Sequence, residues 1–398
     1  MPPFWESLLK GYVKKAFYPG TRRESFADRE EFTEGDYRFF AHGVQALNVA
    51  FTRERYSLPR NYLNQKELRS GYILYFLPVN ALKVTALLDQ NLRNFLPLRI
   101  LDLGSGPGTG MLGTFLYLEK LLRAKGPQGE LQLEWVLVDQ NHQALKDAES
   151  LYRSALDHLT KANPGWMIRS TFHLKVGNLF SEKVSQVVGS SGLSGEADLI
   201  LGLNFLSELP AGKRAPLLEV LLKRHLSEKG KILLMEPALQ ETTRQLMELH
   251  NEIVDRQCGF VFAPCLHQAE CPMLKANNRD WCHTYIPWER PPWIEKLDRL
   301  ASIRKEYLKC SYLLLGKEPP KPLPRNTWRV VSGPLNSKGK SERLLCGEAA
   351  LPNLLRIVRL DKDQSAANRA FDSVERGDLV EMEKRERISR ETLLSKIN

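Results

Sequence analysis

The sequence predicts an α/β protein with a doubly wound parallel sheet, a helical region before the sheet and a cysteine-rich insert after it. Two observations lead to this fold class. Between residues 97 and 257, five short apolar runs alternate with longer amphipathic stretches, which is the pattern of strands that alternate with helices. A glycine-rich loop follows the first apolar run directly and opens the next helical stretch.

The composition fits a folded protein with a basic surface. The chain has 398 residues, 42% of them apolar, which is enough for two or three units with packed cores. Its formal net charge of +10 makes a polyanion such as nucleic acid a reasonable partner, although an ordinary solvated surface can have the same composition. The most apolar stretch is interrupted by Pro78, Asn80 and Lys83, so we expect no membrane partner. We also expect a monomer.

The start of the chain bears on its compartment. It lacks the apolar core and cleavage site of a secretory signal peptide. Five basic residues in the first 23 positions suit a mitochondrial presequence, but Glu6 and Glu24 do not, since such segments are poor in acids. We therefore expect a cytoplasmic bacterial protein, with the mitochondrial matrix as the alternative. In either compartment the six cysteines are expected as thiols or metal ligands.

Hydrophobic periodicity and composition divide the chain into five segments. Apolar residues recur at spacings of three and four before the sheet, which predicts helices there. The segments are an N-terminal helical region (1–95), the sheet domain (96–257), the cysteine-rich insert (258–310), strands and a basic hairpin that complete the sheet (311–360), and a charged tail (361–398). The predicted strands of the sheet domain are 98–103, 135–139, 171–176, 198–203 and 231–236.

The glycine loop runs from Asp102 to Gly110. Glycines allow a tight turn and let a ligand approach the start of a helix, where exposed N–H groups favour anionic or polar groups. The dinucleotide pattern G-x-G-x-x-G would need glycine at position 109, which is Thr109. With Asp102 two residues before the first glycine, the loop instead resembles motif I of class I methyltransferases, which have a Rossmann-like fold and bind S-adenosylmethionine. The resemblance implies cofactor contacts from Asp102, Gly104, Ser105, Gly106 and Gly108.

Two further residues follow predicted strands at positions suited to the same cofactor. Asp139 ends the second strand, where a carboxylate can accept hydrogen bonds from ribose hydroxyls. The alternative is an ordinary helix N-cap. Asn178 follows the third strand, where the resembled enzymes contact adenine; the alternative is a surface loop residue.

The methyl-acceptor side carries a weaker pattern. After the fourth strand, enzymes that methylate amino groups of nucleic acids usually have Asn/Asp-Pro-Pro-aromatic, and this chain has Asn-Phe-Leu-Ser-Glu from Asn204 to Glu208. The cysteine nucleophile of cytosine C5 enzymes is missing there too. Asn204 and Glu208 are the candidate catalytic residues, with helix capping as the alternative for Glu208.

Four cysteines form a candidate metal site. Three lie within 18 residues and one far downstream, as Cys265, Cys271, Cys282 and Cys346. Clustered thiolates with one remote partner can close a four-ligand site. Zinc sites usually contain cysteine pairs about two to four residues apart, so the wider spacing here favours a [4Fe–4S] cluster over zinc. His267 and His283 are alternative ligands, and Cys258 and Cys310 are expected to be small core residues.

Several stretches together resemble the methyltransferase-like proteins of the small ribosomal subunit, which occur in bacteria and mitochondria and are linked to ribosome assembly. The stretches are 101–108, 263–267, 271–272, 281–283, 311–313, 329–334 with Cys346, and 376–378. The resemblance implies that Cys265, Cys271, Cys282 and Cys346 hold a [4Fe–4S] cluster and that the partner is small-subunit ribosomal RNA. It leaves open whether such a protein methylates this RNA or binds it as a non-catalytic assembly factor. A zinc-stabilised methyltransferase with a non-RNA substrate is the third hypothesis.

The basic hairpin is the candidate RNA surface. Residues 317–345 carry seven basic and two acidic side chains, with Trp328 among them. Basic side chains around an aromatic ring suit a phosphate backbone and a stacked base. Lys275, Arg279 and Trp281 are expected to extend this surface, and a solvated hairpin is the alternative.

Overall fold

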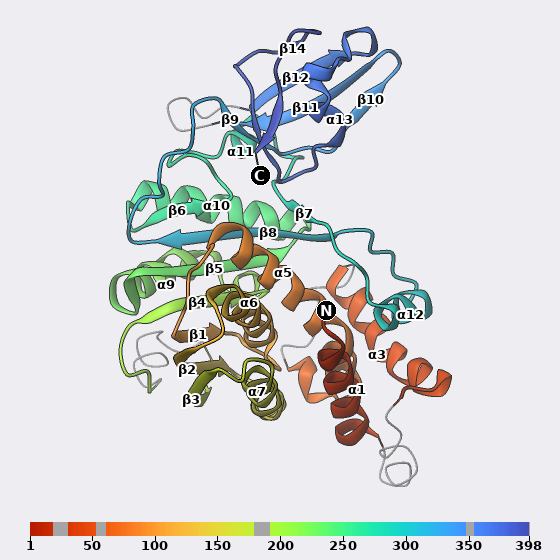
Figure 1. Ribbon diagram of the computed structural model, residues 1–398, viewed down its shortest axis with the longest axis vertical. Coiled ribbons are helices and arrows are strands. Elements are labelled where there is room, and N and C mark those ends of the chain that lie inside the picture. The colour runs from red at the N-terminus through yellow and green to blue at the C-terminus, as the bar shows by residue number, and fades with distance from the viewer. Residues whose placement is uncertain (19–30, 53–60, 179–191, 348–353, 398) are drawn as a thin grey trace. The chain divides into compact units, whose positions relative to one another are not determined.

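A computed structural model describes the chain except for residues 19–30, 53–60, 179–191, 348–353 and 398 (Figure 1). The chain divides into two compact units. The first comprises Met1–Leu203 and Ile286–Leu308, and the second comprises Asn204–Tyr285 and Lys309–Asn398.

The first unit begins with helices, as the sequence predicts. They are α1 (Pro3–Phe17), α3 (Glu34–Thr52), the 3-10 turn η2 (Tyr62–Asn64), α4 (Lys66–Gly71), the π-helical turn η3 (Tyr72–Phe76) and α5 (Leu77–Asn91). α1 buries Trp5, Leu9 and Val13, four residues apart, so its apolar stripe faces the interior. The wide π turn comes directly before Pro78, whose ring in a regular α-helix would clash with the carbonyl four residues earlier.

The continuous helical stretch Lys66–Asn91 is long and apolar enough, by length and composition, to cross a membrane. However, 72% of its most apolar window is buried inside the protein, as in the core helix of a folded domain. Part of this burial is against α6 (Thr109–Lys125), where Gly113 permits close contact, since a Cβ there would lie 2.6 Å from Val84 Cβ. Packing within the first unit therefore accounts for the apolar character of this helix.

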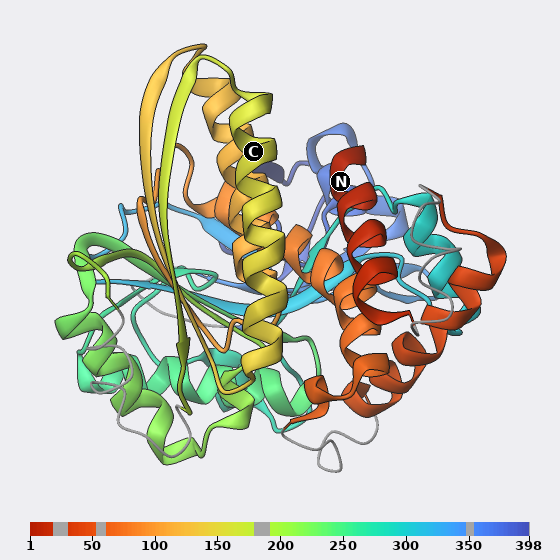
Figure 2. The ribbon, with the colours of Figure 1, turned by 90° about the horizontal axis from the view of Figure 1, so that it is seen from below.

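Four parallel strands form the sheet of the first unit. They are β1 (Arg99–Leu103), β2 (Gly129–Asp139), β3 (Trp166–Val176) and β4 (Ala197–Leu203), in the order β3-β2-β1-β4. α6 and α7 (His142–Ala162) lie side by side along the strands (Figure 2). The chain winds outward from β1 to β3 and then returns to the other side of β1. Ligands of open α/β sheets bind at this kind of reversal, beyond the carboxyl ends of the strands.

β2 and β3 are longer than the sequence predicts, since they begin at residues 129 and 166. The early part of β2 alternates, with Leu131 and Leu133 buried and Glu130 and Gln132 exposed. A half-exposed strand of this kind has no continuous apolar run, so the sequence pattern indicates only its fully buried end.

The second unit begins with η4 (Leu206–Glu208), α9 (Ala211–Arg224), β5 (Leu226–Pro237) and α10 (Gln240–Arg256). The next elements are β6 (Phe260–Ala263), α11 (Pro272–Ala276), β7 (Thr284–Ile286) and β8 (Leu308–Gly316). β8 runs antiparallel to both β5 and β6. The prediction of a wholly parallel sheet is therefore wrong, and the α/β architecture is mixed. A parallel strand requires a crossover that returns the chain to the starting end of the sheet, and β8 enters from the opposite end.

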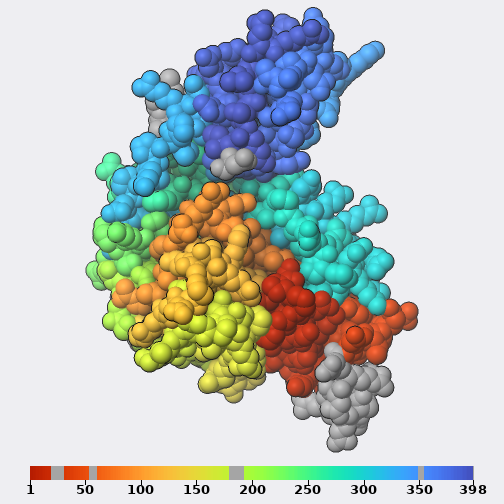
Figure 3. All heavy atoms as spheres, in the orientation of Figure 1, coloured from red at the N-terminus to blue at the C-terminus, as the bar shows by residue number. Residues whose placement is uncertain are grey.

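The C-terminal part of the second unit forms another sheet with its own core. Its elements are β9 (Thr327–Val330), β10 (Leu335–Ser337), β11 (Lys340–Cys346), β12 (Leu354–Leu360), η5 (Asp361–Asp363), η6 (Ala366–Asn368), α13 (Ala370–Ser373), β13 (Leu379–Glu381), β14 (Arg387–Ile388) and β15 (Ser395–Ile397). The strand order is β14-β12-β11-β9-β13-β15, and β10 pairs with β11. These segments pack closely together, as the blue part of Figure 3 shows.

This second sheet corrects two expectations. Residues 361–397 are not a charged tail, because Phe371, Val380 and Ile388 are buried in the core of the sheet. Strands β9 to β12 belong to this separate sheet and do not extend the one formed by β5, β8 and β6. The apolar residues of this region stand singly between charged ones, so their sequence reads as a solvated tail.

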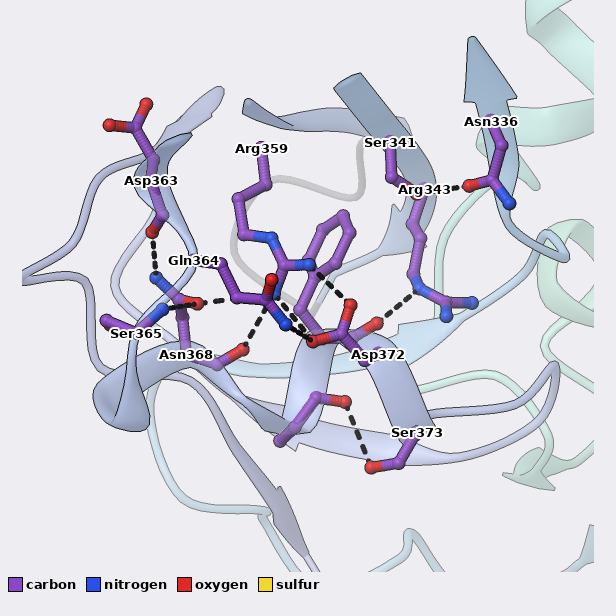
Figure 4. A network of polar contacts seen from close by, with 12 residues as sticks. Asn336, Ser341, Arg343, Arg359, Asp363, Gln364, Ser365, Asn368, Asp372 and Ser373 are labelled. Atoms are coloured by element: carbon purple, nitrogen blue, oxygen red, sulfur yellow. Dashed lines mark hydrogen bonds and ion pairs between the residues drawn. The ribbon is translucent and has the colours of Figure 1, made fainter. Parts of the chain in front are cut away.

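A buried arginine ties α13 to β12. Arg359 is 5% exposed and donates to both carboxylate oxygens of Asp372, with Nη1 at 3.0 Å from Oδ2, and to Asn368 Oδ1 at 3.3 Å (Figure 4). Its guanidinium also lies 4.7 Å from the ring centroid of Phe371. Arg343 donates to the Phe371 carbonyl at 2.9 Å. The charged residues of the supposed tail are therefore partly structural.

Candidate functional site

The glycine loop joins β1 to α6 in a conformation that only glycine adopts readily. Gly104, Gly106 and Gly108 have φ of 67°, 52° and 98°. An L-residue in this left-handed region is strained by roughly 1–2 kcal/mol. The loop is held against β2, because Gly104 N–H and Ser105 N–H both donate to the Val138 carbonyl, at 2.8 and 3.1 Å.

Two glycines of the loop have different surroundings. A Cβ on Gly110 would lie 2.5 Å from Asp102 Oδ2, so this glycine permits close packing of α6 on β1. Of the residues that the structure describes, a Cβ on Gly106 would meet only Leu63, with Cδ1 at 3.9 Å. The open space at Gly106 leaves room for a ligand against the backbone, as the sequence predicts for a cofactor loop.

Two polar side chains of the loop are buried without protein partners. Asp102 is fully buried, and neither of its carboxylate oxygens has a hydrogen bond within the described residues. Burial, and next the charge of Asp139, raise the pKa of Asp102 to about 8, and the nearby Met111 N–H offsets part of this rise. Ser105 is 4% exposed, and its hydroxyl likewise has no partner among these residues. Orphaned polar groups beside an open cradle fit a polar, positively charged ligand such as S-adenosylmethionine.

Asp139 lies across the loop at the end of β2. Its Oδ2 accepts from Gly106 N–H at 2.8 Å, and its Oδ1 accepts from Asn141 N–H at 2.7 Å. Burial raises the pKa of Asp139, and these backbone donors oppose the rise. The helix-cap alternative is wrong, because the N-cap of α7 is Asn141, whose side chain accepts from Ala144 N–H at 2.9 Å. A carboxylate has about four acceptor positions, so Asp139 retains capacity for ribose hydroxyls.

Asn178 lies next to this site. It follows β3 and is half-buried, and the preceding Gly177 N–H donates to the Asp139 carbonyl at 3.1 Å. The structure therefore brings Asp102, the glycines, Asp139 and Asn178 to one edge of the parallel sheet.

The N-terminal helices also contribute to this edge, which the sequence reasoning missed. Asn141 Nδ2 donates to Asn64 Oδ1 at 2.9 Å, and Tyr72 Oη lies 3.3 Å from Thr109 Oγ1. A buried ion pair between Arg69 and Asp147, at 2.8 Å, joins α4 to α7. No local pattern marks Asn64, because its role comes from a contact across 77 positions of sequence.

Replacing Asn64 with alanine should weaken S-adenosylmethionine binding about threefold, the value of one modest hydrogen bond. The change removes the partner of Asn141, whose backbone N–H orients Asp139. Calorimetric titration would measure the dissociation constant, with the exposed neighbour variant Gln65→Ala as the control. Equal affinities in the two variants would contradict this role.

The pKa of Asp102 predicts a pH-dependent stability. The pKa is about 8 in the fold and about 4 in an unfolded chain, so the folded state retains a proton that the unfolded chain releases. Stability from this group is therefore present at low pH and lost as pH rises toward 8. Between about pH 5 and pH 8, the ligand-free protein should lose on the order of 4 kcal/mol relative to Asp102→Asn. Denaturant unfolding across this range checks it, and parallel curves for both proteins would contradict it.

The candidate catalytic residues belong to the second unit. Asn204 has a φ of 55°, and its N–H donates to the Met235 carbonyl at 2.7 Å. Glu208 ends η4, two residues after Leu206, whose N–H donates to Glu236 Oε1 at 2.9 Å. Non-glycine residues in the left-handed region are uncommon and often lie at functional positions, which keeps Asn204 a candidate.

The four predicted cysteine ligands line one pocket of the second unit. Cys265 follows β6, Cys271 is the N-cap of α11, Cys282 precedes β7, and Cys346 ends β11. His267 lies in the same pocket, with Nε2 3.9 Å from Cys346 Sγ. The pocket measures about 490 Å³, part of it open to solvent, and no carboxylate lines it. Sulfur-rich donor sets of this kind select zinc or iron–sulfur clusters.

The electrostatics of the pocket agree with this convergence. Burial raises the pKa of Cys265 to about 11. Burial, and next the charges of neighbouring cysteines, raise the pKa of Cys271 to about 11 and that of Cys282 to about 12. The pKa of Cys346 is also raised well above its usual value, first by burial and then by the other three thiols. As placed, however, no three Cys, His, Asp or Glu side chains in the described parts of the chain are arranged to hold a metal ion. The four thiols therefore share a pocket, but the described residues do not form a metal site there.

The remaining cysteines and histidine lie outside this pocket. Cys310 is buried in β8, in agreement with the prediction of a core residue, and Cys258 is half-buried after α10. His283 Nδ1 is 3.2 Å from the Trp281 carbonyl and 3.3 Å from Arg376 Nη1. His267 is thus the histidine that meets the cysteines.

The predicted RNA surface needs correction. Trp328 is 6% exposed and donates from Nε1 to the Met382 carbonyl at 2.9 Å, so it is a core residue and offers no face to a base. Arg343 is also buried, against Phe371. Lys321, Arg325 and Lys338 remain exposed. Burial of the aromatic ring removes the stacking part of the prediction and leaves a reduced basic surface.

The family model described as mitochondrial small ribosomal subunit Rsm22 matches residues 71–378. The chain belongs to the Rsm22 family. The match begins at the π turn, includes the glycine loop and the four pocket cysteines, and ends at Asp378. No protein of curated function matches the chain.

Solved methyltransferases are among the structures similar to this Rsm22-family chain. A methyltransferase of the DUF858 family from Leishmania major is 12% identical, with a TM-score of 0.27, and the match covers 50% of this chain and 61% of that one. The plantazolicin methyltransferase BpumL is 13% identical, with a TM-score of 0.33 and coverage of 72% and 100%. Magnesium protoporphyrin IX methyltransferase from Synechocystis PCC 6803 is 12% identical, with a TM-score of 0.33 and coverage of 69% and 99%. TM-scores this low do not establish a common fold, so strand order and the family match carry the assignment.

Proposed function

We propose that this Rsm22-family chain is an S-adenosylmethionine-binding, methyltransferase-like protein that acts on the small ribosomal subunit. The glycine loop carries the proposal. Within the described residues, Gly106 faces open space beside the buried side chains of Asp102 and Ser105, which have no hydrogen-bond partner there. S-adenosylmethionine supplies a methyl group activated by a sulfonium charge. Asp102 would lie toward that positive ligand, Asp139 would accept from ribose hydroxyls, and Asn178 would contact adenine.

The family description supports the proposed partner and compartment. The Rsm22 family is described as belonging to the mitochondrial small ribosomal subunit. This favours small-subunit ribosomal RNA as the partner, and the mitochondrial matrix over the bacterial cytoplasm. The formal net charge of +10 supports a polyanionic partner.

The catalytic step would depend on residues that follow β4. Asn204 and Glu208 are the candidates, and they would act by positioning an acceptor near the methyl group. The acceptor motif of amino-methylating enzymes is missing from 204–208. This observation favours a second candidate function, that of an assembly factor that binds cofactor and RNA without catalysis.

We also propose that Cys265, Cys271, Cys282 and Cys346 hold a [4Fe–4S] cluster, with zinc as the alternative. The support is a pocket with four thiols and no lining carboxylate. The raised pKa values of the free thiols mean that a bound cation would be needed to stabilise their thiolate forms. A cluster would supply a crosslink between β6, α11, β7 and β11.

The experiment that tests the function replaces the cellular gene with the Gly106→Ala variant. Loss of one methyl group from small-subunit ribosomal RNA, mapped by mass spectrometry, would support methylation. Fewer assembled small subunits with every methyl group retained would support the non-catalytic factor. Normal methylation and normal assembly, with the variant protein present at wild-type level, would contradict both.

A further inference from the structure

Charged side chains from two distant segments of the first unit meet beside the π turn η3. Lys83 belongs to α5, and Arg290, Asp298 and Lys305 belong to the segment that contains α12 (Pro292–Leu300). Asp298 accepts a hydrogen bond from Tyr75 Oη at Oδ1, and Arg290 Nη1 lies 3.2 Å from Oδ2, which has no hydrogen bond within the described residues. It is the acid that these basic groups share.

Lys305 is the least satisfied member of this group. Its Nζ donates to Tyr75 Oη at 3.2 Å, and the described residues provide no second hydrogen-bond acceptor for it. An ammonium has three donors, so most of its capacity is unused. The rings of Tyr75 and Phe76, with centroids 5.0 and 5.9 Å from Nζ, stabilise the charge only weakly.

The charges around Lys305 are mainly positive. Burial, followed by the charge of Lys83, lowers the pKa of Lys305 to about 8, and Arg290 acts in the same direction. Asp298 opposes them. A buried cation beside other cations is costly unless an anion joins them. The group is reachable, since Lys305 is half-buried and the Arg290 side chain is 28% exposed.

The π turn η3 connects this group of charged residues to the glycine loop. Tyr72, at the start of η3, places its Oη 3.3 Å from Thr109 Oγ1, at the first residue of α6. The Tyr72 ring packs on Phe76, with centroids 6.1 Å apart, and Phe76 is next to Lys305. π turns are frequent at functional sites. A ligand bound at Lys305 would therefore be near the candidate cofactor loop.

We propose that Arg290 and Lys305 form a binding site for a phosphate group, contributed by the RNA acceptor. The proposal rests on the function proposed above for its RNA source, and the site itself rests on the charges and hydrogen bonds of the first unit. Arginine and lysine together are the usual ligands of phosphate, one as a planar fork and the other as a point charge.

The test compares the full-length wild type with Lys305→Gln and Lys305→Arg, and uses Lys120→Gln as the control. Lys120 is an exposed lysine of the same unit, in a surface ion pair with Asp89. Melting temperature is measured in increasing inorganic phosphate against chloride at constant ionic strength. Phosphate should stabilise the wild type, Lys305→Arg and Lys120→Gln, and it should not stabilise Lys305→Gln. Equal stabilisation of Lys305→Gln would overturn the site.

A second titration identifies the source of the phosphate. Affinity for a single-stranded small-subunit RNA fragment should fall about tenfold in Lys305→Gln, and the salt slope should decrease by about one. If inorganic phosphate binding is lost in this variant and RNA affinity is not, the ligand is a free phosphate compound and the RNA assignment is wrong. S-adenosylmethionine titration of the same samples separates the phosphate site from the proposed function. Phosphate binding without cofactor binding would overturn the proposed function, and the phosphate site would still stand.

Discussion

Replacing Gly106 with alanine should weaken S-adenosylmethionine binding about a hundredfold, or roughly 2.7 kcal/mol, and leave the fold intact. Gly106 has a φ of 52°, and among the described residues a Cβ there would meet only Leu63 Cδ1, at 3.9 Å. The protein itself therefore has room for the methyl group. The added carbon would occupy the space assigned to the cofactor, and the strain of a left-handed alanine would disturb the N–H that Asp139 accepts.

Calorimetric titration would measure the loss of cofactor affinity, and thermal unfolding would measure the stability of the fold. Gly339→Ala is the matched control, since Gly339 also has a positive φ, of 79°, and a Cβ there would meet nothing within 4 Å among the described residues. Both variants should lose a similar small amount of stability, and only Gly106→Ala should lose cofactor affinity. Unchanged affinity in Gly106→Ala would mean that the open space at the loop is not the cofactor site.

Replacing Cys346 with serine should remove most of the bound iron and destabilise the second unit by several kcal/mol. The wild type, purified without oxygen, should contain about four irons and four sulfides per chain. Cys346 ends β11, and the other three thiols come from the segment between β6 and β7. Without it, the cluster would lose its one ligand from the C-terminal sheet and the crosslink that this ligand makes.

Iron, sulfide and zinc analysis with a visible spectrum would measure this effect. Cys258→Ser is the control, because Cys258 is half-buried after α10 and does not line the pocket. It should retain wild-type iron. One zinc per chain and no sulfide would show that the cysteines hold zinc and not a cluster. Iron retained by Cys346→Ser would show that this cysteine is not a ligand.

Local patterns predicted the parts of the site that follow strands. Asp102 is the next-to-last residue of β1 and Asp139 is the last residue of the neighbouring parallel strand β2, so their meeting at one sheet edge follows from the fold class. The four cysteines were grouped across 81 positions because buried thiols are chemically distinctive, and they do share a pocket.

The incorrect and missed sequence predictions have a common physical cause. The residues concerned make tertiary contacts with distant parts of the chain, and such contacts leave no local pattern in the sequence. Trp328 sits among basic residues in the sequence, yet its ring is buried under a strand 50 positions later, at Val380 and Met382. Asn64 reaches the site through one side-chain hydrogen bond to Asn141. In the strands of the second sheet, apolar residues stand singly between charged ones. The hydropathy pattern therefore does not predict the core of this sheet.

Ultraviolet crosslinking of methyl-labelled S-adenosylmethionine to the full-length protein, followed by peptide mapping, would locate the cofactor. If the glycine loop binds it, label should appear on peptides that contain the loop between Asp102 and Gly110 or the end of β2 at Asp139, and this label should be lost in Gly106→Ala. Saturable label confined to other peptides, or no label on protein that is folded and carries its metal, would contradict cofactor binding at the glycine loop.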